Sequence, residues 1–319
     1  MENHQEHVED MSISEAIVLP RIAMLCKQLA SGQRTPEQLS AFINGTNPFA
    51  DDVNKVKDDP VSVIKRQIRF AKKILGYKNV LGPGEIKRSF DIELSSEQIP
   101  LIPFTREELM TAKRLRQFLV LRVDKMADEQ PLTMKNIYDY CQSKKTREAL
   151  DEDDWYKNEE FYTMDIPRVG WHLVSQEPIK KSFGEHCLNQ TQALADYLAD
   201  VFGSNLPSKY QQAVDEFKAK RKNIDALELN WQEKAKRLSN LSINQLCRRL
   251  PVEEHYDTLL YFLSNNIKLL RNKYDWTFRL GSGGFMIILA SVGSDNIDTY
   301  RYFPDSLDIH CGVCFSRGF

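Results

Sequence analysis

The last part of the chain changes from a helical pattern to a strand pattern, and this change constrains the fold more than any other feature. From Trp276 onward, β-branched and aromatic residues alternate with glycine-rich turns, as in "WTFRL", "GSGG" and "FMIILASV". This pattern is typical of antiparallel hairpins. An earlier stretch, "GWHLVS" at Gly170–Ser175, also predicts a strand. One strand, then helices, then several strands predict an α+β domain over residues 165–319.

Helical spacing and capping signals dominate the rest of the chain. Pro60 precedes a segment whose apolar residues recur at helical spacing and which stops at Gly76. A restart is indicated by Ser242 and Gln245 inside a long helical segment. The other helices that we expect cover residues 106–128, 132–144, 190–202, 209–250 and 252–274. Capping boxes that mark helix starts occur at Ser12, Thr35 and Thr105.

These patterns divide the chain into three segments. Residues 1–104 form a helical N-terminal region, which ends where "GPGE" and "IPLIPF" interrupt the helical rhythm. Residues 105–164 contain a helical pair followed by the acidic linker "DEDDWYKNEEF". Residues 165–319 form the α+β domain, which contains a long helical segment. The predicted fold class is therefore α+β, with a helical region before a loop-rich antiparallel sheet.

Composition excludes several classes of partner. The formal net charge of −2 gives no electrostatic reason to expect nucleic acid or an anionic membrane as the main partner. The chain has no apolar run long enough to span a bilayer and no signal-peptide pattern at its start. Its six cysteines are scattered, which favours reduced thiols in a long chain of this kind. We therefore expect a cytoplasmic protein with no membrane partner.

The sequence "HCGVC" at His310–Cys314 contains the only C-x-x-C motif. Thiols at this spacing bind zinc or form a redox disulfide, but on a strand they point to opposite faces. No second Cys or His pair with metal-ligand spacing accompanies them. Packing in the core is therefore the favoured interpretation, and we expect no metal and no cofactor.

Motifs that would indicate an enzyme are otherwise missing. "GSGG" at Gly281–Gly284 lacks the Lys-Ser/Thr of a phosphate loop and precedes a strand, so a hairpin turn is favoured. No G-x-S-x-G or H-E-x-x-H motif occurs. The isolated histidines are His172, His186 and His255, and the expected core anchors are Trp171, Trp231 and Trp276. The sequence favours a protein without catalytic activity, and we name no catalytic residue.

The helix predicted after Pro60 carries a basic face made of Lys65, Arg69, Lys72 and Lys73. One interpretation is a solvated helix face. The other is a surface that binds phosphates or an acidic partner. Nucleic acid therefore stays open as a partner through residues 61–75.

The residues after Met286 use a restricted set of amino acids. Lys, Glu, Gln, Met and Trp are missing there, although Asp and Arg are present. Strand propensity disfavours Lys, Glu and Gln, but it does not separate Asp from Glu or Arg from Lys. Codons that end in a pyrimidine encode every residue type found from Ile287 to Phe319 and none of the missing ones. Such a bias arises when adenines in Asn-type codons are randomised at their first two positions.

This tail resembles the variable end of proteins diversified by retroelements. In that family a mutable cassette closes a C-type-lectin-like or formylglycine-generating-enzyme-like domain. "GVCFSR" at Gly312–Arg317 is similar to the family's closing Gly-Val/Phe strand, and "FRLGSGG" at Phe278–Gly284 is similar, in altered order, to an upstream Arg-Gly-Gly-Ser segment. The resemblance covers residues 165–319 and implies that the early strand "WHLVS" pairs with the last one, with two helices following the early strand.

The resemblance implies a ligand-binding protein that displays a diversified surface on a rigid sheet to a protein or other macromolecule. Tyr and Arg give such surfaces contact area and hydrogen bonds at low entropy cost. The supporting core would contain Ile287, Leu289, Ile309 and Val313. The residues that we expect to face the ligand are Asp295, Asn296, Asp298, Tyr300, Arg301, Tyr302, Phe303, Asp305, Asp308 and His310. Ordinary hairpin packing is the alternative for the three aromatic residues of this set.

Two other functions stay open. The first is an α+β regulatory or interaction protein without catalytic activity, whose basic helix docks to nucleic acid or to an acidic partner. The second is an enzyme of the formylglycine-generating type that uses Cys311 and Cys314. The enzyme requires both thiols to face one cleft.

Overall fold

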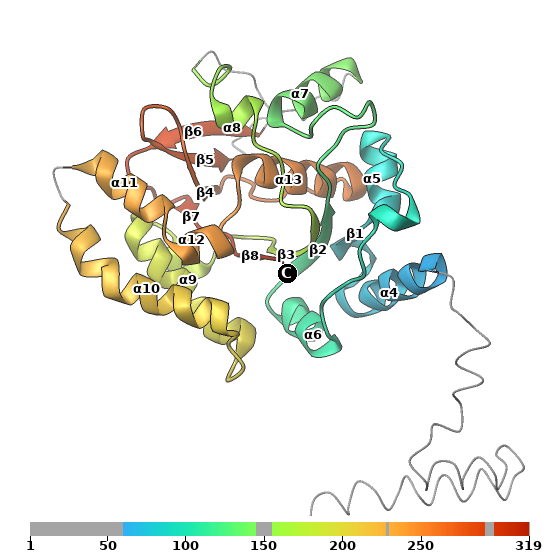
Figure 1. The fold of residues 1–319 in the computed structure, drawn as a ribbon, viewed down its shortest axis with the longest axis horizontal. Coiled ribbons are helices and arrows are strands. Elements are labelled where there is room, and N and C mark those ends of the chain that lie inside the picture. The colour runs from blue at the N-terminus through green and yellow to red at the C-terminus, as the bar shows by residue number, and fades with distance from the viewer. Residues whose placement is uncertain (1–59, 145–154, 228–229, 291–296, 319) are drawn as a thin grey trace, which may run out of the picture. The chain divides into compact units, whose positions relative to one another are not determined.

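Two four-stranded sheets organise the part of the chain that the computed structural model describes, residues 60–144, 155–227, 230–290 and 297–318 (Figure 1). The first sheet has the order β1 (Val80–Leu81), β2 (Gln117–Arg122), β3 (Gly170–Ser175) and β8 (Ser316–Arg317). The second has the order β6 (Asp298–Tyr302), β5 (Met286–Ala290), β4 (Tyr274–Leu280) and β7 (Cys311–Gly312). Each sheet contains parallel and antiparallel pairs. With helices around both sheets, the described residues are α+β, as predicted.

The first sheet joins strands that are distant in the sequence. β2 is antiparallel to β3 along its whole length, and β1 is parallel to β2. β3 also pairs with β8, through Leu173 opposite Arg317 and Val174 opposite Ser316. The strand predicted at Gly170–Ser175 is therefore confirmed, and it pairs with the last strand of the chain.

The second sheet contains the hairpin that the glycine pattern predicts. β4 and β5 are antiparallel, and Gly284 in the turn between them has a φ of +83°, which favours glycine. β5 then pairs with β6 from Met286 opposite Tyr302 to Ala290 opposite Asp298. "GSGG" is therefore a hairpin turn. Both faces of β5 are apolar because each is packed: Ile287 and Leu289 belong to one hydrophobic cluster, and Met286 and Ile288 belong to another.

One helix prediction is wrong in its second half. The helix predicted over residues 106–128 ends early: α6 (Arg106–Arg114) begins at the Thr105 capping box, and β2 follows. Arg116, between the two elements, has a left-handed φ of +54°, which ends the helix. The six residues of β2 are all buried. A short, continuous apolar run does not distinguish a buried strand from a helix, and this explains the error.

The long helical segment predicted over residues 209–250 consists of three helices. They are α10 (Ser208–Asp225), α11 (Trp231–Ser239) and α12 (Ser242–Cys247), so the restart at Ser242 is confirmed. Asn230 begins α11, because its side chain accepts a hydrogen bond from the Glu233 amide. α9 (Cys187–Phe202) agrees with its prediction, and α13 (Pro251–Asn265) ends earlier than expected.

Among the first helices of the described part, two agree with the prediction and two were not predicted. α4 (Pro60–Leu75) and α7 (Met134–Ser143) are confirmed. α5 (Pro83–Phe90) occupies a stretch that was interpreted as a boundary, and α8 (Glu160–Thr163) lies in the predicted acidic linker. The linker interpretation is wrong from Trp155 onward, because Tyr156, Phe161 and Tyr162 are buried in the core. No helix of the described ranges is both long and apolar enough to cross a membrane.

The predicted boundaries at residues 104 and 164 do not separate domains. The first sheet takes β1 from residues 1–104, β2 from residues 105–164, and β3 and β8 from residues 165–319. Residues 60–319 form one compact unit. The capping boxes predicted at Ser12 and Thr35 lie outside the described residues.

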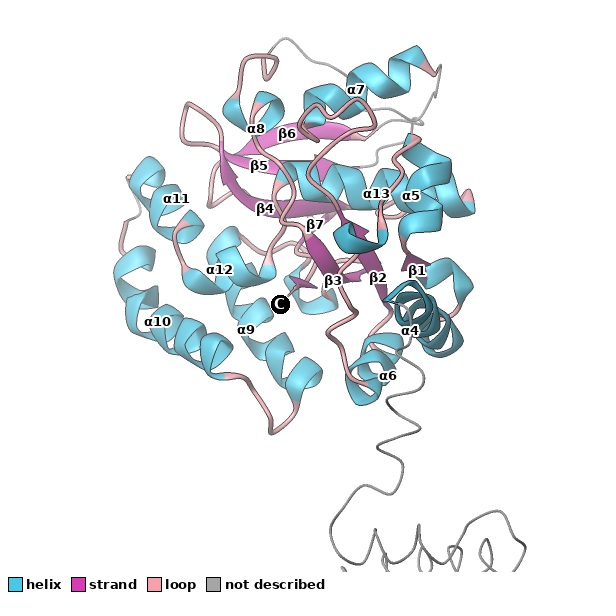
Figure 2. Ribbon diagram, turned by 45° about the vertical axis from the view of Figure 1, so that its right-hand side comes forward, coloured by secondary structure: helices cyan, strands magenta, loops and turns pink. Residues whose placement is uncertain are grey.

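α13 connects the two sheets. It contacts β1 and β2 of the first sheet and β5 of the second (Figure 2). Ile287 and Leu289 of β5 pack in the same hydrophobic cluster as Tyr256 of α13. Met286 and Ile288, on the other face of β5, belong to a second cluster with α9 to α12. β5 therefore lies between two cores, and β6 beside it forms the edge of the sheet.

Candidate ligand-binding surface

The predicted ligand-facing residues lie on β6 and on the loop that follows it. Asp295 and Asn296 fall outside the described residues. Among the others, the exposed ones are Tyr300, Arg301, Phe303, Asp305 and His310, and the half-buried ones are Asp298, Tyr302 and Asp308. None of these described residues is buried, so the structure brings them to the surface of one segment.

Alternation along β6 sends these side chains to two different faces. Arg301 lies opposite Ile287, which belongs to the cluster around α13. Tyr300 and Tyr302 lie opposite Ile288 and Met286, which belong to the other cluster. The predicted residues therefore do not form one flat surface. They form two groups that share the edge strand.

Arg301 is the centre of the first group, which we call the Arg301 patch: Trp155, Trp231, Phe285, Arg301 and Phe303. The guanidinium carbon lies 5.2 Å from the Trp155 ring centroid and 5.4 Å from that of Phe285, within cation–π range. Phe303 packs 5.0 Å from Phe285, and Trp231 lies 4.8 Å from both. Phe303 is 47% exposed, so this aromatic group reaches solvent.

Three members of the Arg301 patch were not predicted as ligand-facing residues. Trp155 comes from the segment before α8, Trp231 begins α11 and Phe285 precedes β5. Trp231 was predicted to be a core anchor, and it is half-buried, whereas Trp171 and Trp276 are buried. No local signal could have found this group, because its members come from three distant segments.

The second group surrounds Tyr274 of β4. The Tyr300 ring stacks on Tyr274 at a centroid distance of 5.8 Å, and the His310 ring lies 6.3 Å from Tyr274. The Tyr302 hydroxyl donates a 2.9 Å hydrogen bond to Asp308. Burial, together with Asp308, raises the pKa of Tyr302 well above its usual value, so the phenol stays protonated. Tyr302 therefore supports the loop, and Tyr300 and His310 are displayed.

The loop after β6 is held at two acidic residues. Asp305 forms a 2.5 Å ion pair with Lys234, a buried lysine of α11. Asp308 accepts hydrogen bonds from the Tyr302 hydroxyl and, at 2.8 Å, from the His310 amide. Both carboxylates therefore have contacts inside the protein, in addition to their position at the surface.

One predicted core residue is wrong. Ile309 is 78% exposed, whereas Ile287, Leu289 and Val313 are fully buried. The prediction assumed strand alternation through Ile309, but this residue belongs to the loop between β6 and β7. The neighbouring Leu307 is 68% exposed, so the loop presents apolar side chains to solvent.

The two cysteines of the C-x-x-C motif pack into different cores. Cys311 belongs to the cluster with α9 to α12, and Cys314 belongs to the cluster around α13. Both are free and buried, and burial raises the pKa of each thiol well above its usual value. This arrangement contradicts an enzyme that needs both thiols in one cleft. Among the described residues, no cluster of His, Cys, Asp or Glu could hold a metal ion.

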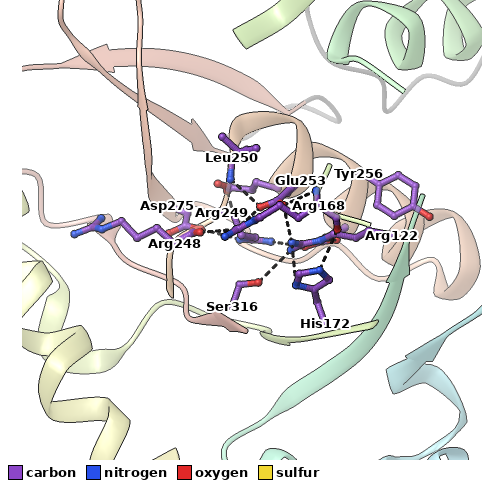
Figure 3. A network of polar contacts seen from close by, with 12 residues as sticks. Arg122, Arg168, His172, Arg248, Arg249, Leu250, Glu253, Tyr256, Asp275 and Ser316 are labelled. Atoms are coloured by element: carbon purple, nitrogen blue, oxygen red, sulfur yellow. Dashed lines mark hydrogen bonds and ion pairs between the residues drawn. The ribbon is translucent and has the colours of Figure 1, made fainter. Parts of the chain in front are cut away.

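A buried charge network lies behind this surface, and the sequence analysis missed it (Figure 3). We call it the buried arginine network. Arg122 of β2 donates hydrogen bonds to Asp257 of α13 at 3.0 and 2.6 Å and to the Ser316 hydroxyl at 3.2 Å. Arg122 and Asp257 are completely buried. One side chain thereby joins β2, α13 and β8.

The network also holds the segment before β8. Arg249 pairs with Asp275 of β4 at 2.8 Å, and Asp275 accepts a 2.6 Å hydrogen bond from the Cys314 amide. Arg168 pairs with Glu253 of α13 at 2.6 Å. Although burial alone would raise the pKa of Glu253, Arg122 and Arg168 hold it well below its usual range. These contacts fix the C-terminal strands against α13.

His172, Glu254 and His255 are buried in this region. Burial is the main cause that lowers the pKa of His172 to about 2 and that of His255 to about 3. Burial and the nearby Asp275 carboxylate raise the pKa of Glu254 well above its usual value. His186 instead begins α9, where its ring accepts a hydrogen bond from the Asn189 amide. These groups therefore belong to the packed interior that holds the strands and α13 together.

The basic face of α4 is partly occupied. Lys65, Arg69 and Lys73 are exposed, but Lys72 forms a 2.9 Å ion pair with Glu85 of α5. The pair with Lys72 helps to lower the pKa of Glu85 against the effect of burial. Three of the four predicted cations thus remain accessible on this helix.

Comparison with known proteins returns no relative. No protein-family model, no curated protein and no solved structure matches this chain. The geometry of the displayed segment and of the network behind it is therefore the basis for assigning a function.

Proposed function

We propose that this chain is a ligand-binding protein in which a rigid sheet displays the residues of segment 298–310 to a protein or other macromolecular ligand. One observation carries the proposal: positions in the restricted-alphabet segment divide sharply by burial. Ile287, Leu289 and Val313 are fully buried, whereas Arg301 and Phe303 are exposed. Exposed substitutions usually change stability by less than about 0.5 kcal/mol, so this surface tolerates variation.

The scaffold behind the surface is rigid. β6 pairs with β5, which is packed on both faces, and the loop after β6 is held by the ion pair between Asp305 and Lys234. After β7 in the chain, the buried arginine network holds the Cys314 amide through Asp275 and the Ser316 hydroxyl through Arg122. A surface that is ordered before binding loses less conformational entropy on binding, which favours affinity.

The finer part of the proposal is a C-type-lectin-like domain diversified by a retroelement. Three features support it. The early strand β3 pairs with the final strand β8, α9 and α10 follow β3, and a hairpin-based second sheet carries the restricted alphabet. The exposed aromatic and Arg side chains are those that protein-binding surfaces favour.

The gene provides the direct test. We expect pyrimidines at the third base of the codons from Ile287 to Phe319, and a near-copy of this stretch in the flanking DNA that differs only at adenines. A reverse transcriptase gene beside the copy would complete the expected arrangement. Purine-ending codons through this stretch, with no copy, would remove the retroelement from the proposal and leave only the binding surface.

The binding surface has a separate test. A display library with pyrimidine-ending codons at Tyr300, Arg301, Phe303 and His310 should stay mostly protease-resistant and should yield binders to an arbitrary target such as lysozyme. A matched library at the buried positions Leu289 and Val313 should lose most of its folded members. Equal losses in both libraries, or no binder from the first, would contradict a display role.

One observation favours a second function. Lys65, Arg69 and Lys73 are exposed together on α4, which suits docking to nucleic acid or to an acidic partner. Charge reversal at these residues should abolish salt-dependent binding of a double-stranded DNA oligonucleotide, and Lys222→Glu on α10 is the matched control. Absent binding, or binding that salt does not weaken, would exclude this function.

A further inference from the structure

We propose that a pocket beside α9 binds a small zwitterionic molecule, such as a free amino acid or a short peptide with both termini charged. The pocket has a volume of about 420 Å³, within the range of small-molecule sites. It lies between the end of α6, the end of β3, the β3–α9 connection and α9. It shares no residue with the Arg301 patch or with segment 298–310, so this proposal is independent of the display function.

The pocket is lined by charges of both signs on two different elements. Lys180 and Lys181 lie on the short helix η3 (Lys180–Ser182), which we call the basic wall, and Asp196 and Asp200 lie on α9, which we call the acidic wall. All four are exposed at its rim. No ion pair within the described residues joins the two walls. Asp196 accepts a 2.8 Å hydrogen bond from the Gln192 side chain at one carboxylate oxygen, but neither wall is neutralised by the other, so both keep their charge for a ligand.

The other charges of the rim neutralise one another. Glu177 pairs with Arg116 at 3.2 Å and with Lys273 at 3.0 Å. The hydrogen bond from Lys273 lowers the pKa of Glu177, so this carboxylate is ionised and already has partners. Because the lining contains equal numbers of acidic and basic side chains, a ligand with a single charge is attracted by one wall and repelled by the other. A ligand with two opposite charges satisfies both.

The floor of the pocket suits an apolar body with one polar group. Leu115, Ile179 and Ala193 provide apolar surface. Ser175, which is only 5% exposed, also lines the pocket, and its hydroxyl lies beside that of Tyr197, another lining residue. The Tyr197 hydroxyl accepts a 3.1 Å hydrogen bond from the Gln117 side chain. These two hydroxyls give a ligand polar groups next to the apolar surface.

The basic wall is fixed without a ligand. The Ile179 amide donates to the Val313 carbonyl at 2.9 Å, and the Val313 amide donates to the Ser182 hydroxyl at 2.9 Å. The Ser182 hydroxyl in turn donates to the Ile179 carbonyl at 2.6 Å. These bonds attach the β3–α9 connection to the C-terminal strands, so binding does not have to order this wall.

The test uses the full chain and a matched set of probes in isothermal titration calorimetry. The zwitterions are L-leucine, glycyl-L-leucine and L-leucyl-glycyl-glycine, which differ in charge separation. The controls are N-acetyl-L-leucine, L-leucinamide and N-acetyl-L-leucinamide, which carry one charge or none. We expect at least one zwitterion to bind with a Kd near 1 mM or below, and its blocked analogues to bind at least about tenfold more weakly. Failure of all three zwitterions at about 10 mM, or equal binding of the neutral control, overturns the proposal.

Variants locate the binding in this pocket. Lys181→Glu and Asp196→Asn should each weaken the zwitterion about tenfold, which corresponds to the loss of one charge contact. Both positions are exposed, so circular dichroism should show an unchanged fold. Lys222→Glu, an exposed reversal on α10 outside the pocket, should leave binding unchanged. Binding that survives both pocket variants would place the ligand elsewhere and overturn the assignment.

Discussion

The displayed segment and the buried arginine network lie on neighbouring elements, yet they are built from opposite kinds of contact. On β6 and its loop, aromatic stacking and single hydrogen bonds hold side chains that remain partly in water. In the network, Arg122 and Asp257 are fully buried and make several charged hydrogen bonds each. When a contact at the surface is lost, water takes the place of the missing partner. When a buried ion pair loses one member, no water reaches the remaining charge. The two regions should therefore respond very differently to substitution.

The largest effect should come from separating the buried charges. Asp257→Asn or Arg122→Met leaves an uncompensated partner in the core, and we expect a loss of about 3–5 kcal/mol of unfolding free energy. Urea denaturation measures it. The matched control is Arg301→Asn on β6. Apart from the loss of its contacts with the Trp155 and Phe285 rings, this exposed substitution should lower the free energy of unfolding by less than about 0.5 kcal/mol. Equal losses at Asp257 and Arg301 would show that burial does not distinguish the two regions.

A glycine between the regions should give the next effect. A Cβ atom at Gly312 of β7 would lie 2.7 Å from Pro178 and 2.9 Å from the Ser182 hydroxyl. Overpacking of this kind costs about 1–3 kcal/mol, so Gly312→Ala should lower the thermal midpoint. Gly84 of α5 meets only the end of the Arg88 side chain at 3.5 Å, and Gly84→Ala should be neutral or stabilising. A neutral result at Gly312 would indicate that the β3–α9 connection moves freely.

The pH dependence of stability should reveal the buried histidine of α13. The pKa of His255 is lowered to about 3 from 6.5, so the folded state prefers the neutral ring. The lowered pKa contributes to the free energy of unfolding above pH 6.5. This contribution is lost as the pH falls toward 3, because the unfolded chain binds the proton at a higher pH than the folded protein does. At pH 5 the expected loss is about 2 kcal/mol. His255→Leu should remove this part of the slope between pH 7 and pH 5 in denaturation curves; an unchanged slope would contradict it.

The smallest effects should lie on the displayed segment. Phe303→Ser removes a ring that is 47% exposed and stacks on Phe285 and Trp231. We expect the free energy of unfolding to fall by about 0.5–1.5 kcal/mol, because the substitution removes these aromatic contacts. His310→Asn should change stability by less than about 0.5 kcal/mol. Thermal unfolding measures both, and a loss at His310 that approaches the loss at Asp257 would remove the contrast between the regions.

Much of the local structure could be predicted because its signals are local. The Thr105 capping box, the stop at Gly76 and the turn at Gly284 each depend on the conformational preferences of a few adjacent residues. The strand at Gly170–Ser175 and the hairpin from β4 to β5 follow from residue type and alternation. The segment Arg106–Asp128 shows the limit, because an apolar run fits a buried strand as well as a helix.

The sequence by itself determined the α+β class, most helix positions and the surface location of the ligand-facing residues that it predicted from Asp298 to His310. Only the tertiary structure decided which of those residues share a face, since Trp155, Trp231 and Arg301 meet from three distant segments. Only the tertiary structure also decided the buried arginine network, in which Arg122 binds Asp257, a residue that is distant in the sequence. The physical reason is range: propensity and alternation act over a few residues, whereas charge pairing and ring stacking depend on distance in space.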